Sequence, residues 1–380
     1  MSFADIVSIE DNGADPYGDP IENLNAINGA LGTGAPVVIP AKPFPFSGTI
    51  NVPTRGQMLF GLGNQSQLYQ HAPNTDAVVL AQSALAEVIC RDFMIFAADG
   101  VDFSQGGVGV KSLYCGNIRI EGVSVVRMHC GSYIDTQTNV NTSDIYLNNF
   151  HAIHTVEDGI IFNNCIQAYA TNSSAKSCGG NGAKIVDGSA CHLDHFLSLS
   201  NAICGVKVWT SVNATTDWHF FDQLECDGNG IDGIRAINTK GLQVSNSWAG
   251  SSGQVGWNFL SGNSQLLMNN TTAKKNGAHG LYACDLTDSG IANFAGNWNG
   301  HSAPSSAAVM INGACSGVSI SNPIVSEMLA PKTQAFGIRV AGASNDIQVT
   351  GGRSRGNLTA QYYNDSTGSG NRVTGLLGYN

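Results

Sequence analysis

A regularly repeated glycine is the feature that most constrains how this chain folds. Between residues 157 and 286, a glycine precedes a short stretch with alternating apolar residues six times, at intervals of 23, 23, 28, 23 and 24 residues. A fixed period in the twenties with a short strand in each copy is typical of a solenoid, in which successive repeats stack on one another. The repeated glycines are Gly159, Gly182, Gly205, Gly233, Gly256 and Gly280.

The residues after each glycine alternate with a period of about two, which indicates a strand and not a helix. Examples are Gly182-Ala183-Lys184-Ile185 and Gly205-Val206-Lys207-Val208. A repeat of about 23 residues has room for three strands of ~4–5 residues and three bends. The pattern therefore predicts an all-β parallel β-helix, with roughly 12–13 turns along the whole chain.

Composition and charge limit the classes of molecule that this chain is expected to bind. Charged residues make up only 12% of the chain, whereas 46 of its 380 residues are glycine, which favours strands joined by tight bends. The net charge of −10 argues against nucleic acid, whose affinity relies on cationic contacts with phosphates. No stretch approaches the ~18 apolar residues of a membrane helix, so no membrane partner is expected. Residues 1–5 show no basic segment followed by an apolar run, so no signal peptide is expected.

The ten cysteines do not follow a metal-binding pattern. No two of them form a Cys-x-x-Cys pair, and most lie in or beside predicted strands. A reduced cysteine in such a place behaves as a small buried hydrophobic residue. Buried free thiols are therefore favoured over disulfides and over metal ligands, and neither a metal nor a cofactor is expected.

Residues 1–35 are expected to cap the solenoid, and residues 36–380 are expected to form the solenoid with a short C-terminal cap. Ile21, Leu24 and Ile27 recur at helical spacing directly after a proline, which suits the first turn of a helix. Such a capping helix would cover the open edge of the strand stack, which otherwise invites aggregation.

Four short segments carry a resemblance to a known superfamily. They are Asp11–Gly18, with the pattern Asp-x-Gly-Ala-Asp-Pro-x-Gly, Ala26–Leu31, Val37–Pro40 and the Leu-x-Gly-x-Gly segment Leu59–Gly63. Together they resemble the start of the pectate-lyase-like right-handed β-helix proteins, which include pectate lyases, polygalacturonases and phage tailspike depolymerases. One departure is Asp19–Glu22, which stands where these proteins usually have an acidic run.

This resemblance implies a right-handed single-stranded parallel β-helix and a polysaccharide substrate. Among these proteins, the chain resembles phage tailspike depolymerases most, because no signal peptide is visible in its sequence. They are typically homotrimers, so the resemblance also implies a homotrimer in a virion tail or otherwise outside the cell. The same superfamily hosts lyases, hydrolases, transferases and binding proteins, so the activity depends on the site.

Outward side chains of a parallel sheet form columns, because equivalent positions stack about 4.8 Å apart. Buried positions must be apolar, and this fixes the phase of each strand. The residues expected to point inward are Ile118, Ile145, Leu193, Trp218 and Leu242. The outward residues that then meet on two adjacent turns are His192, Asp194, Asp217 and His219.

Asp194 and Asp217 are expected to lie roughly 5–8 Å apart as diagonal neighbours. Glycoside hydrolysis uses two carboxyl groups in this range, one as acid and the other as nucleophile or base. Crowding would raise the pKa of one carboxyl and leave the other ionised. The alternative interpretation is a solvated wall, because outward positions on any solenoid are polar.

Further candidates surround this group. Asp222, Glu225 and Asp227 are expected in the bend after the same wall. A basic column, Lys184, Lys207 and Arg235, indicates an acidic ligand or acidic partners such as Glu225 and Asp227, because stacked like charges repel. The candidate catalytic residues are Asp194, Asp217, Glu225 and His219. The candidate substrate-binding residues are His192, Tyr146, Tyr169, Lys184, Lys207, Trp209, Asp222, Asp227 and Arg235.

The favoured function is a polysaccharide-degrading enzyme of the tailspike depolymerase type, a glycoside hydrolase that acts on a bacterial surface or extracellular polysaccharide through paired carboxylates. Two alternatives stay open. A polysaccharide lyase would use the basic column to neutralise a uronate and His219 as the base. A non-catalytic adhesin would bind a glycan on the same polar face without cleaving it.

Overall fold

The parallel β-helix predicted from the sequence is confirmed by the computed structural model, which describes residues 6–53, 56–80, 87–113, 116–136, 144–211, 218–327 and 331–379. All strand pairs in the described residues are parallel, as the register of β11 with β14 illustrates. They form three sheets, here called A, B and C, and sheet C has 13 strands, which agrees with the predicted number of turns. The chain divides into two compact units, residues 1–192 and 193–380.

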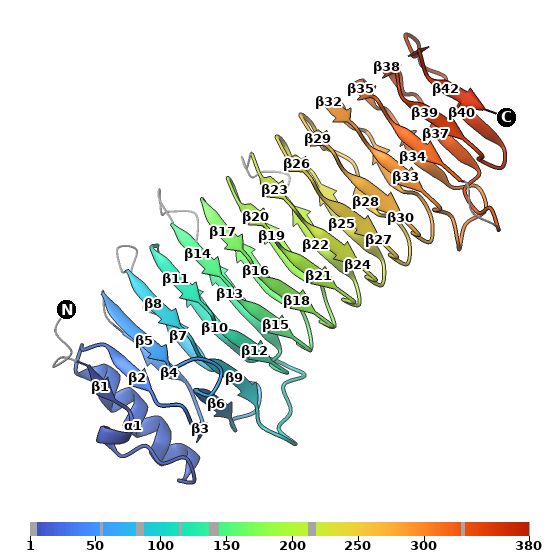
Figure 1. Cartoon of the computed structure of the whole chain (residues 1–380). Coiled ribbons are helices and arrows are strands. Elements are labelled where there is room, and N and C mark those ends of the chain that lie inside the picture. Colours follow the sequence, from blue (N-terminus) through green and yellow to red (C-terminus); the bar gives the residue numbers. More distant parts are fainter. Residues whose placement is uncertain are drawn as a thin grey trace. The chain divides into compact units, whose positions relative to one another are not determined.

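Each turn contributes one strand to sheet A, then one to sheet B and one to sheet C (Figure 1). In the first unit, sheet A contains β1 (Val7–Ser8), β2 (Val37–Ile39), β5 (Gln57–Gly61), β8 (Val88–Arg91), β11 (Ile118–Glu121), β14 (Ile145–Asn148) and β17 (Ala168–Thr171). Sheet B contains β3 (Pro43–Phe46), β6 (Gln67–Gln70), β9 (Met94–Ala97), β12 (Ser124–Val126), β15 (His151–Ile153) and β18 (Ser174–Lys176). Sheet C contains β4 (Ile50–Val52), β7 (Val78–Leu80), β10 (Val108–Leu113), β13 (Cys130–Asp135), β16 (Ile160–Asn163) and β19 (Ala183–Val186).

The second unit has the same order of strands. After β20 (His192–Asp194), which contains the boundary between the units, sheet A contains β23 (Phe220–Asp222), β26 (Gln243–Ser245), β29 (Leu267–Asn269), β32 (Thr287–Ala292), β35 (Ser316–Ser321), β38 (Asn345–Thr350) and β41 (Arg372–Thr374). Sheet B contains β21 (Leu197–Leu199), β24 (Glu225–Asp227), β27 (Trp248–Gly250), β30 (Thr272–Lys274), β33 (Ala295–Asn297), β36 (Ile324–Ser326), β39 (Arg353–Arg355) and β42 (Leu377–Tyr379). Sheet C contains β22 (Cys204–Trp209), β25 (Asp232–Ile237), β28 (Trp257–Phe259), β31 (Leu281–Cys284), β34 (Ala307–Asn312), β37 (Phe336–Val340) and β40 (Ala360–Asn364).

The capping elements before the first complete turn are β1, a 3-10 helix (Glu10–Asn12) and α1 (Pro20–Gly32), so the predicted capping helix is present. The side chain of Asp19 caps α1 by accepting hydrogen bonds from the backbone N–H groups of Ile21 and Glu22. Such a cap satisfies donors that the first helical turn leaves unpaired. Among the described helices, none has the length and apolar character that would take it across a membrane.

Two amide ladders run along the second unit. The bend ladder follows the strands of sheet A, where Asn246, Asn270 and Asn293 have φ values of 49–53° and Asn270 Nδ2 donates to Asn246 Oδ1 at 2.8 Å. Asparagine adopts this left-handed conformation more readily than most residues. The buried ladder lies in the interior, and its members are Asn276, Asn299, Gln334 and Asn357. Asn299 accepts a hydrogen bond from Asn276 Nδ2 at 2.9 Å and donates one to Gln334 Oε1 at 3.2 Å.

The cysteines behave as expected for buried hydrophobic residues. All nine cysteines in the described part of the chain are free, and all except Cys284 are buried. Burial raises the pKa of the Cys90 thiol to about 12, so this side chain stays neutral. Cys115 lies outside the described residues.

Candidate functional site

The carboxylate group predicted on sheet A needs correction in the second unit. His219 is fully buried and Trp218 is 43% exposed, so the prediction of an inward Trp218 and an outward, catalytic His219 is wrong. Asp217, the other predicted carboxylate, lies outside the described residues. The remaining inward predictions, which are buried as expected, are Ile118, Ile145, Leu193 and Leu242.

The prediction placed the alternation of inward and outward residues in β23 one residue out of register. The register pairs Phe220 with Gln243 and Asp222 with Ser245, and Phe221 is the buried residue of the strand. The stretch from 218 to 222 has aromatic residues in both phases, and a slip of one residue exchanges the inward and outward side chains of a strand.

The same shift moves Asp222 from the predicted bend to the outward end of β23. The backbone N–H of His195 donates to the Asp222 carbonyl at 3.1 Å, just as that of Gln223 donates to the Ser245 carbonyl at 3.2 Å one turn later. Asp194 and Asp222 therefore occupy equivalent last positions of the adjacent strands β20 and β23. Equivalent positions on adjacent strands are about 4.8 Å apart, so the second unit does contain a carboxylate pair.

His195 lies beside both carboxylates. Its ring Nδ1 is 2.9 Å from Asp194 Oδ1, and both side chains are about half exposed. Burial alone would raise the pKa of Asp222, but hydrogen bonds from Ser245, Asn246 and Gln223, together with the nearby His195, hold this pKa below its usual value. The Ser245 hydroxyl donates to Asp222 Oδ1 at 2.5 Å. Asp222 is therefore held as a carboxylate beside the contact between Asp194 and His195.

Sequence reasoning missed His195. With a φ of 48°, it occupies the bend position that Asn246, Asn270 and Asn293 fill in later turns. An imidazole cannot reproduce the hydrogen bonds of an amide ladder in the same geometry. A histidine in a series of asparagines was the signal in the sequence that would have indicated this position.

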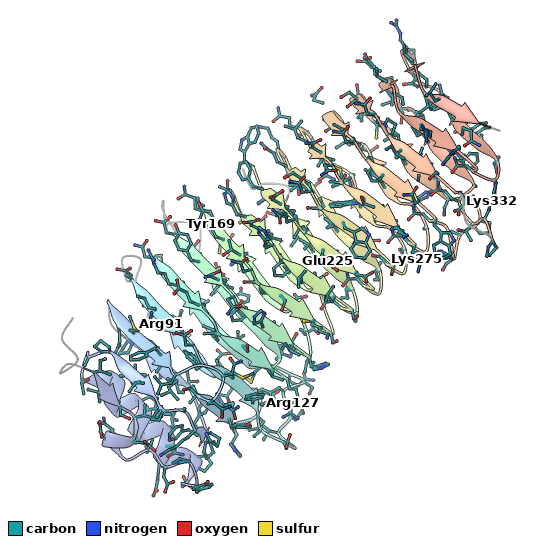
Figure 2. All side chains as sticks on the ribbon, in the orientation of Figure 1. Arg91, Arg127, Tyr169, Glu225, Lys275 and Lys332 are labelled. Carbon is teal, nitrogen blue, oxygen red and sulfur yellow. The ribbon has the colours of Figure 1, made fainter. Side chains whose placement is uncertain are left out.

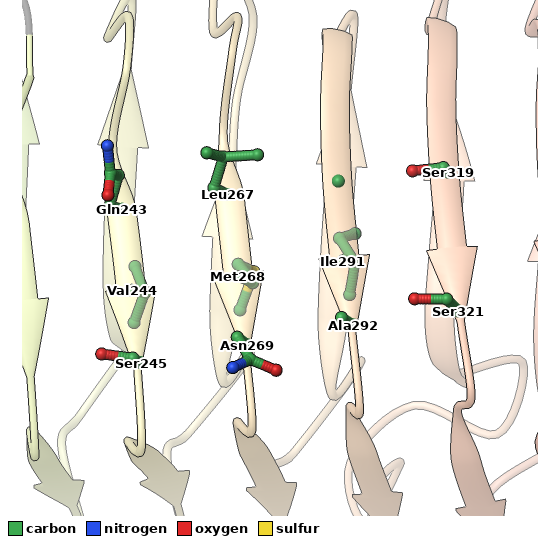
Figure 3. Close-up of a pocket in the computed structure, with 11 residues that line it drawn as sticks. Gln243, Val244, Ser245, Leu267, Met268, Asn269, Ile291, Ala292, Ser319 and Ser321 are labelled. Atoms are coloured by element: carbon green, nitrogen blue, oxygen red, sulfur yellow. The ribbon is translucent and has the colours of Figure 1, made fainter.

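An open groove of about 360 Å³ continues from this cluster along the outer face of sheet A (Figure 3). It crosses β26, β29, β32 and β35, and Ser245, which binds Asp222, lines its first strand. The groove exists because the outward positions in its centre, Gly290 and Ala292, have little or no side chain. The predicted site residues thus adjoin a groove that the sequence analysis did not anticipate.

Three of the predicted binding residues form a stacked column in the first unit, in which Tyr169 is labelled in Figure 2. The rings of Tyr146 and Tyr169 stack with centroids 4.9 Å apart, and those of Tyr169 and His192 stack at 4.5 Å. The guanidinium of Arg119 covers Tyr146 at 5.5 Å. Both faces of Tyr169 are therefore covered by protein, so this ring offers its edge and hydroxyl rather than a face.

Two members of the basic column are paired with acidic residues other than those predicted. Lys184 Nζ lies 3.3 Å from Asp158 Oδ2 in the first unit, and Arg235 Nε lies 2.6 Å from Asp232 Oδ2 in the second. Lys207 is in register with Arg235 on sheet C. The expectation that Glu225 and Asp227 are the acidic partners is therefore wrong for Lys184 and Arg235.

Glu225 and Asp227 belong to β24 of sheet B rather than to a bend (Glu225 is labelled in Figure 2). Trp209 ends β22 of sheet C and is 40% exposed. These three residues therefore lie on sheets other than the one that carries Asp194 and Asp222. Within the described residues, no group of three or more His, Cys, Asp or Glu side chains is arranged to hold a metal ion.

Comparison with solved structures supports the same fold. The A-module of mannuronan C-5 epimerase AlgE6 from Azotobacter vinelandii superposes with a TM-score of 0.65 at 16% identity, covering 98% of this chain and 99% of that one. The pre-mature gene product 12 of bacteriophage phi29 gives a TM-score of 0.71 at 14% identity, and covers 98% of this chain and 56% of that one. The fold is a parallel β-helix.

A third similar structure is the catalytic unit of a GH87 α-1,3-glucanase from Streptomyces thermodiastaticus, with a TM-score of 0.55 at 13% identity, covering 99% of this chain and 70% of that one. No protein-family model and no curated protein sequence matches the chain. At these identities the comparisons establish the architecture, and the activity has to be argued from the site.

Proposed function

We propose that this chain is a polysaccharide-degrading enzyme, a glycoside hydrolase that acts at the outer face of sheet A in the second unit. The observation that carries the proposal is the pair of outward carboxylates, Asp194 and Asp222, on adjacent strands beside an open groove. Glycosidases use two carboxyl groups that flank the scissile bond, one to protonate the leaving oxygen and one to stabilise or attack the sugar carbon.

The surroundings of the two carboxylates support a different role for each. Asp222 is the ionised partner, because its hydrogen bonds favour the charged form and hold its pKa down. Asp194, whose Oδ1 lies 2.9 Å from His195 Nδ1, takes the other role and protonates the leaving-group oxygen.

The similar structures favour the same substrate class. They include an α-1,3-glucanase, an epimerase of mannuronan and the tailspike protein 3 of bacteriophage CBA120. Their names support a polysaccharide substrate, and the tailspike supports a place in a virion tail for this chain.

Lyase chemistry has less support in the same geometry. A lyase has to neutralise a uronate carboxylate, and the basic residues predicted for this task lie on sheet C. Lys184 and Arg235 already have carboxylate partners. The predicted lyase base, His219, is buried.

The test is a screen of the purified protein against bacterial capsular polysaccharides, exopolysaccharides and plant polysaccharides, in which reducing ends and ultraviolet absorbance are read together. We expect new reducing ends without absorbance, and a loss of at least ~10²-fold in kcat for Asp194→Asn and for Asp222→Asn. Glu225→Gln, on sheet B, is the matched control and should keep full activity.

Each other result would point elsewhere. Full activity of both aspartate variants would reject the site. Products that absorb in the ultraviolet would favour a lyase. Binding without any product across the panel would favour an adhesin.

A further inference from the structure

The groove on sheet A of the second unit is uncharged. None of its 11 lining residues is acidic or basic. Its polar groups are the hydroxyls and amides of Gln243, Ser245, Asn269, Ser319 and Ser321. Its main apolar contribution is the side chain of Leu267, which is 50% exposed (Figure 3). Hydroxyls, amides and an apolar surface are the groups that recognise a molecule rich in hydroxyls and poor in charge.

We propose that this groove binds a segment of an uncharged polysaccharide that runs across the strands of sheet A and reaches Asp222 at one end. The inference names the substrate class of the site described above and rests on the proposed function of that site.

The length and direction of the groove fit a chain of several sugars. The groove extends over four consecutive strands, from β26 to β35, which corresponds to about 14 Å at the spacing of adjacent strands. Its first strand contributes Ser245, whose hydroxyl donates to Asp222. A polymer lying in the groove therefore passes directly into the carboxylate cluster.

The electrostatics exclude an anionic polymer from this place. The ionised Asp222 lies at the end of the groove, and a uronate brought next to it would meet a like charge that no lysine or arginine of the lining offsets. Arg235 lies on sheet C and is paired with Asp232 at 2.6 Å. Like charges placed together at an interface select against the wrong partner.

Gly290 offers a way to fill the groove without disturbing the sheet. A Cβ atom at this position would meet only side chains, Leu267 Cδ2 at 3.5 Å and Ser319 Oγ at 3.6 Å, which are ordinary contacts. Gly290→Phe should therefore fold and obstruct the groove. Lys274→Phe places the same ring at an exposed outward position of β30 on sheet B, which does not line the groove, and is the matched control.

The experiment measures binding of the Asp194→Asn protein, which should not cleave its ligand and keeps the charge of Asp222, to an array of purified bacterial and plant polysaccharides divided into uncharged and uronate-containing sets. We expect members of the uncharged set to bind and the uronate set not to bind. Gly290→Phe should weaken that binding at least tenfold, and Lys274→Phe should leave it within twofold. Ser319→Lys, which adds a cation at an exposed lining position, should give measurable binding to the uronate set.

Stronger binding to the uronate set, no binding to any uncharged member, or unchanged binding in Gly290→Phe would each overturn the proposal. The failure of the proposed function looks different. If uncharged polysaccharides bind in the groove but the unmodified protein releases no reducing ends, the hydrolase fails and this inference stands. If uronate polymers bind and are hydrolysed, the hydrolase stands and this inference fails.

Discussion

At the scale of single residues, Asp194 and Asp222 differ through their neighbours rather than through their positions. They occupy equivalent ends of adjacent strands, but Asp222 receives hydrogen bonds from Ser245 and Asn246, whereas Asp194 contacts the ring of His195. A carboxylate that accepts hydrogen bonds keeps its charge to lower pH than an isolated one. Two carboxyl groups that are only one strand spacing apart can therefore take different roles in catalysis.

The spacing of the pair predicts the stereochemistry of cleavage. The backbones at equivalent positions on adjacent strands are about 4.8 Å apart, so the carboxyl groups that they carry can approach the ~5–5.5 Å separation of retaining glycosidases. We expect the first product to keep the anomeric configuration of the substrate. Proton NMR of the first minutes of the reaction measures this directly, and an inverted anomer would argue for a wider pair than Asp194 and Asp222.

The acid limb of the pH profile should report Asp222. Its lowered pKa means that the ionised, active form persists to low pH, and activity is lost as the pH falls through that pKa. Ser245→Ala removes one hydrogen bond to the charged form, so the pKa should rise and the acid limb of kcat/KM should move to higher pH. Ser326→Ala, a serine change on sheet B, is the control. If the acid limb does not move in Ser245→Ala, the ionisation that limits activity at low pH does not belong to Asp222.

At the scale of elements, the positions of the strands were easier to predict than which of their residues point inward. The glycines that recur at intervals of 23–28 residues mark the strands of sheet C, and the structure confirms a strand at each of them. The inward phase was correct where a strand has one apolar set, as in β11, where Ile118 and Ile120 are buried. In β23 aromatic residues occupy both phases, so the sequence left the choice open and the inward residue was misassigned.

The buried ladder should contribute more to stability than the bend ladder. Asn299→Ala removes an amide that accepts from the backbone N–H and Nδ2 of Asn276 and donates to Gln334 Oε1 in the interior, so each of these groups loses one hydrogen bond. We expect a loss of about 2–4 kcal/mol in the free energy of unfolding, because several buried polar groups lose partners at once. Asn293→Gly, in the exposed bend ladder, keeps a residue suited to its φ of 52° and should cost less than about 1 kcal/mol. Urea denaturation measures both, and equal losses would contradict this ranking.

At the scale of the whole molecule, the sequence predicted the architecture but only part of the site. Asp194 and Asp222 were both candidates, yet they were assigned to a wall and to a bend, and His195 was missed. The groove could not be predicted, because it depends on which small residues, such as Gly290 and Ala292, become neighbours through the register of β32. The homotrimer stays a prediction, as does the assignment of residues 36–380 to a single solenoid.

The trimer prediction has a measurable basis in the second unit. Ile324 and Leu377, in strands β36 and β42 of sheet B, are each 55% exposed and line a groove of about 510 Å³. Exposed apolar side chains that gather in one place mark a contact surface. We expect sedimentation equilibrium to give three times the 39.7 kDa of one chain, and Ile324→Glu to give the mass of a single chain. Leu358→Glu changes a leucine that is 54% exposed but lies outside the sheets, and it should leave the mass unchanged. A monomer in the unmodified protein would contradict the prediction.

The outward and inward columns of the second unit have a consequence for how such a chain can diversify. The buried residues of each turn, together with the buried ladder, hold the stack, whereas the groove is formed by outward residues such as Gly290, Ala292 and Ser319. A gene encoding this unit can therefore change its recognition surface by substitutions at alternate codons of a few strands, while the intervening codons stay under selection for packing. Positions that tolerate mutation should therefore alternate with positions that do not along β26, β29, β32 and β35. Deep mutational scanning would measure this alternation.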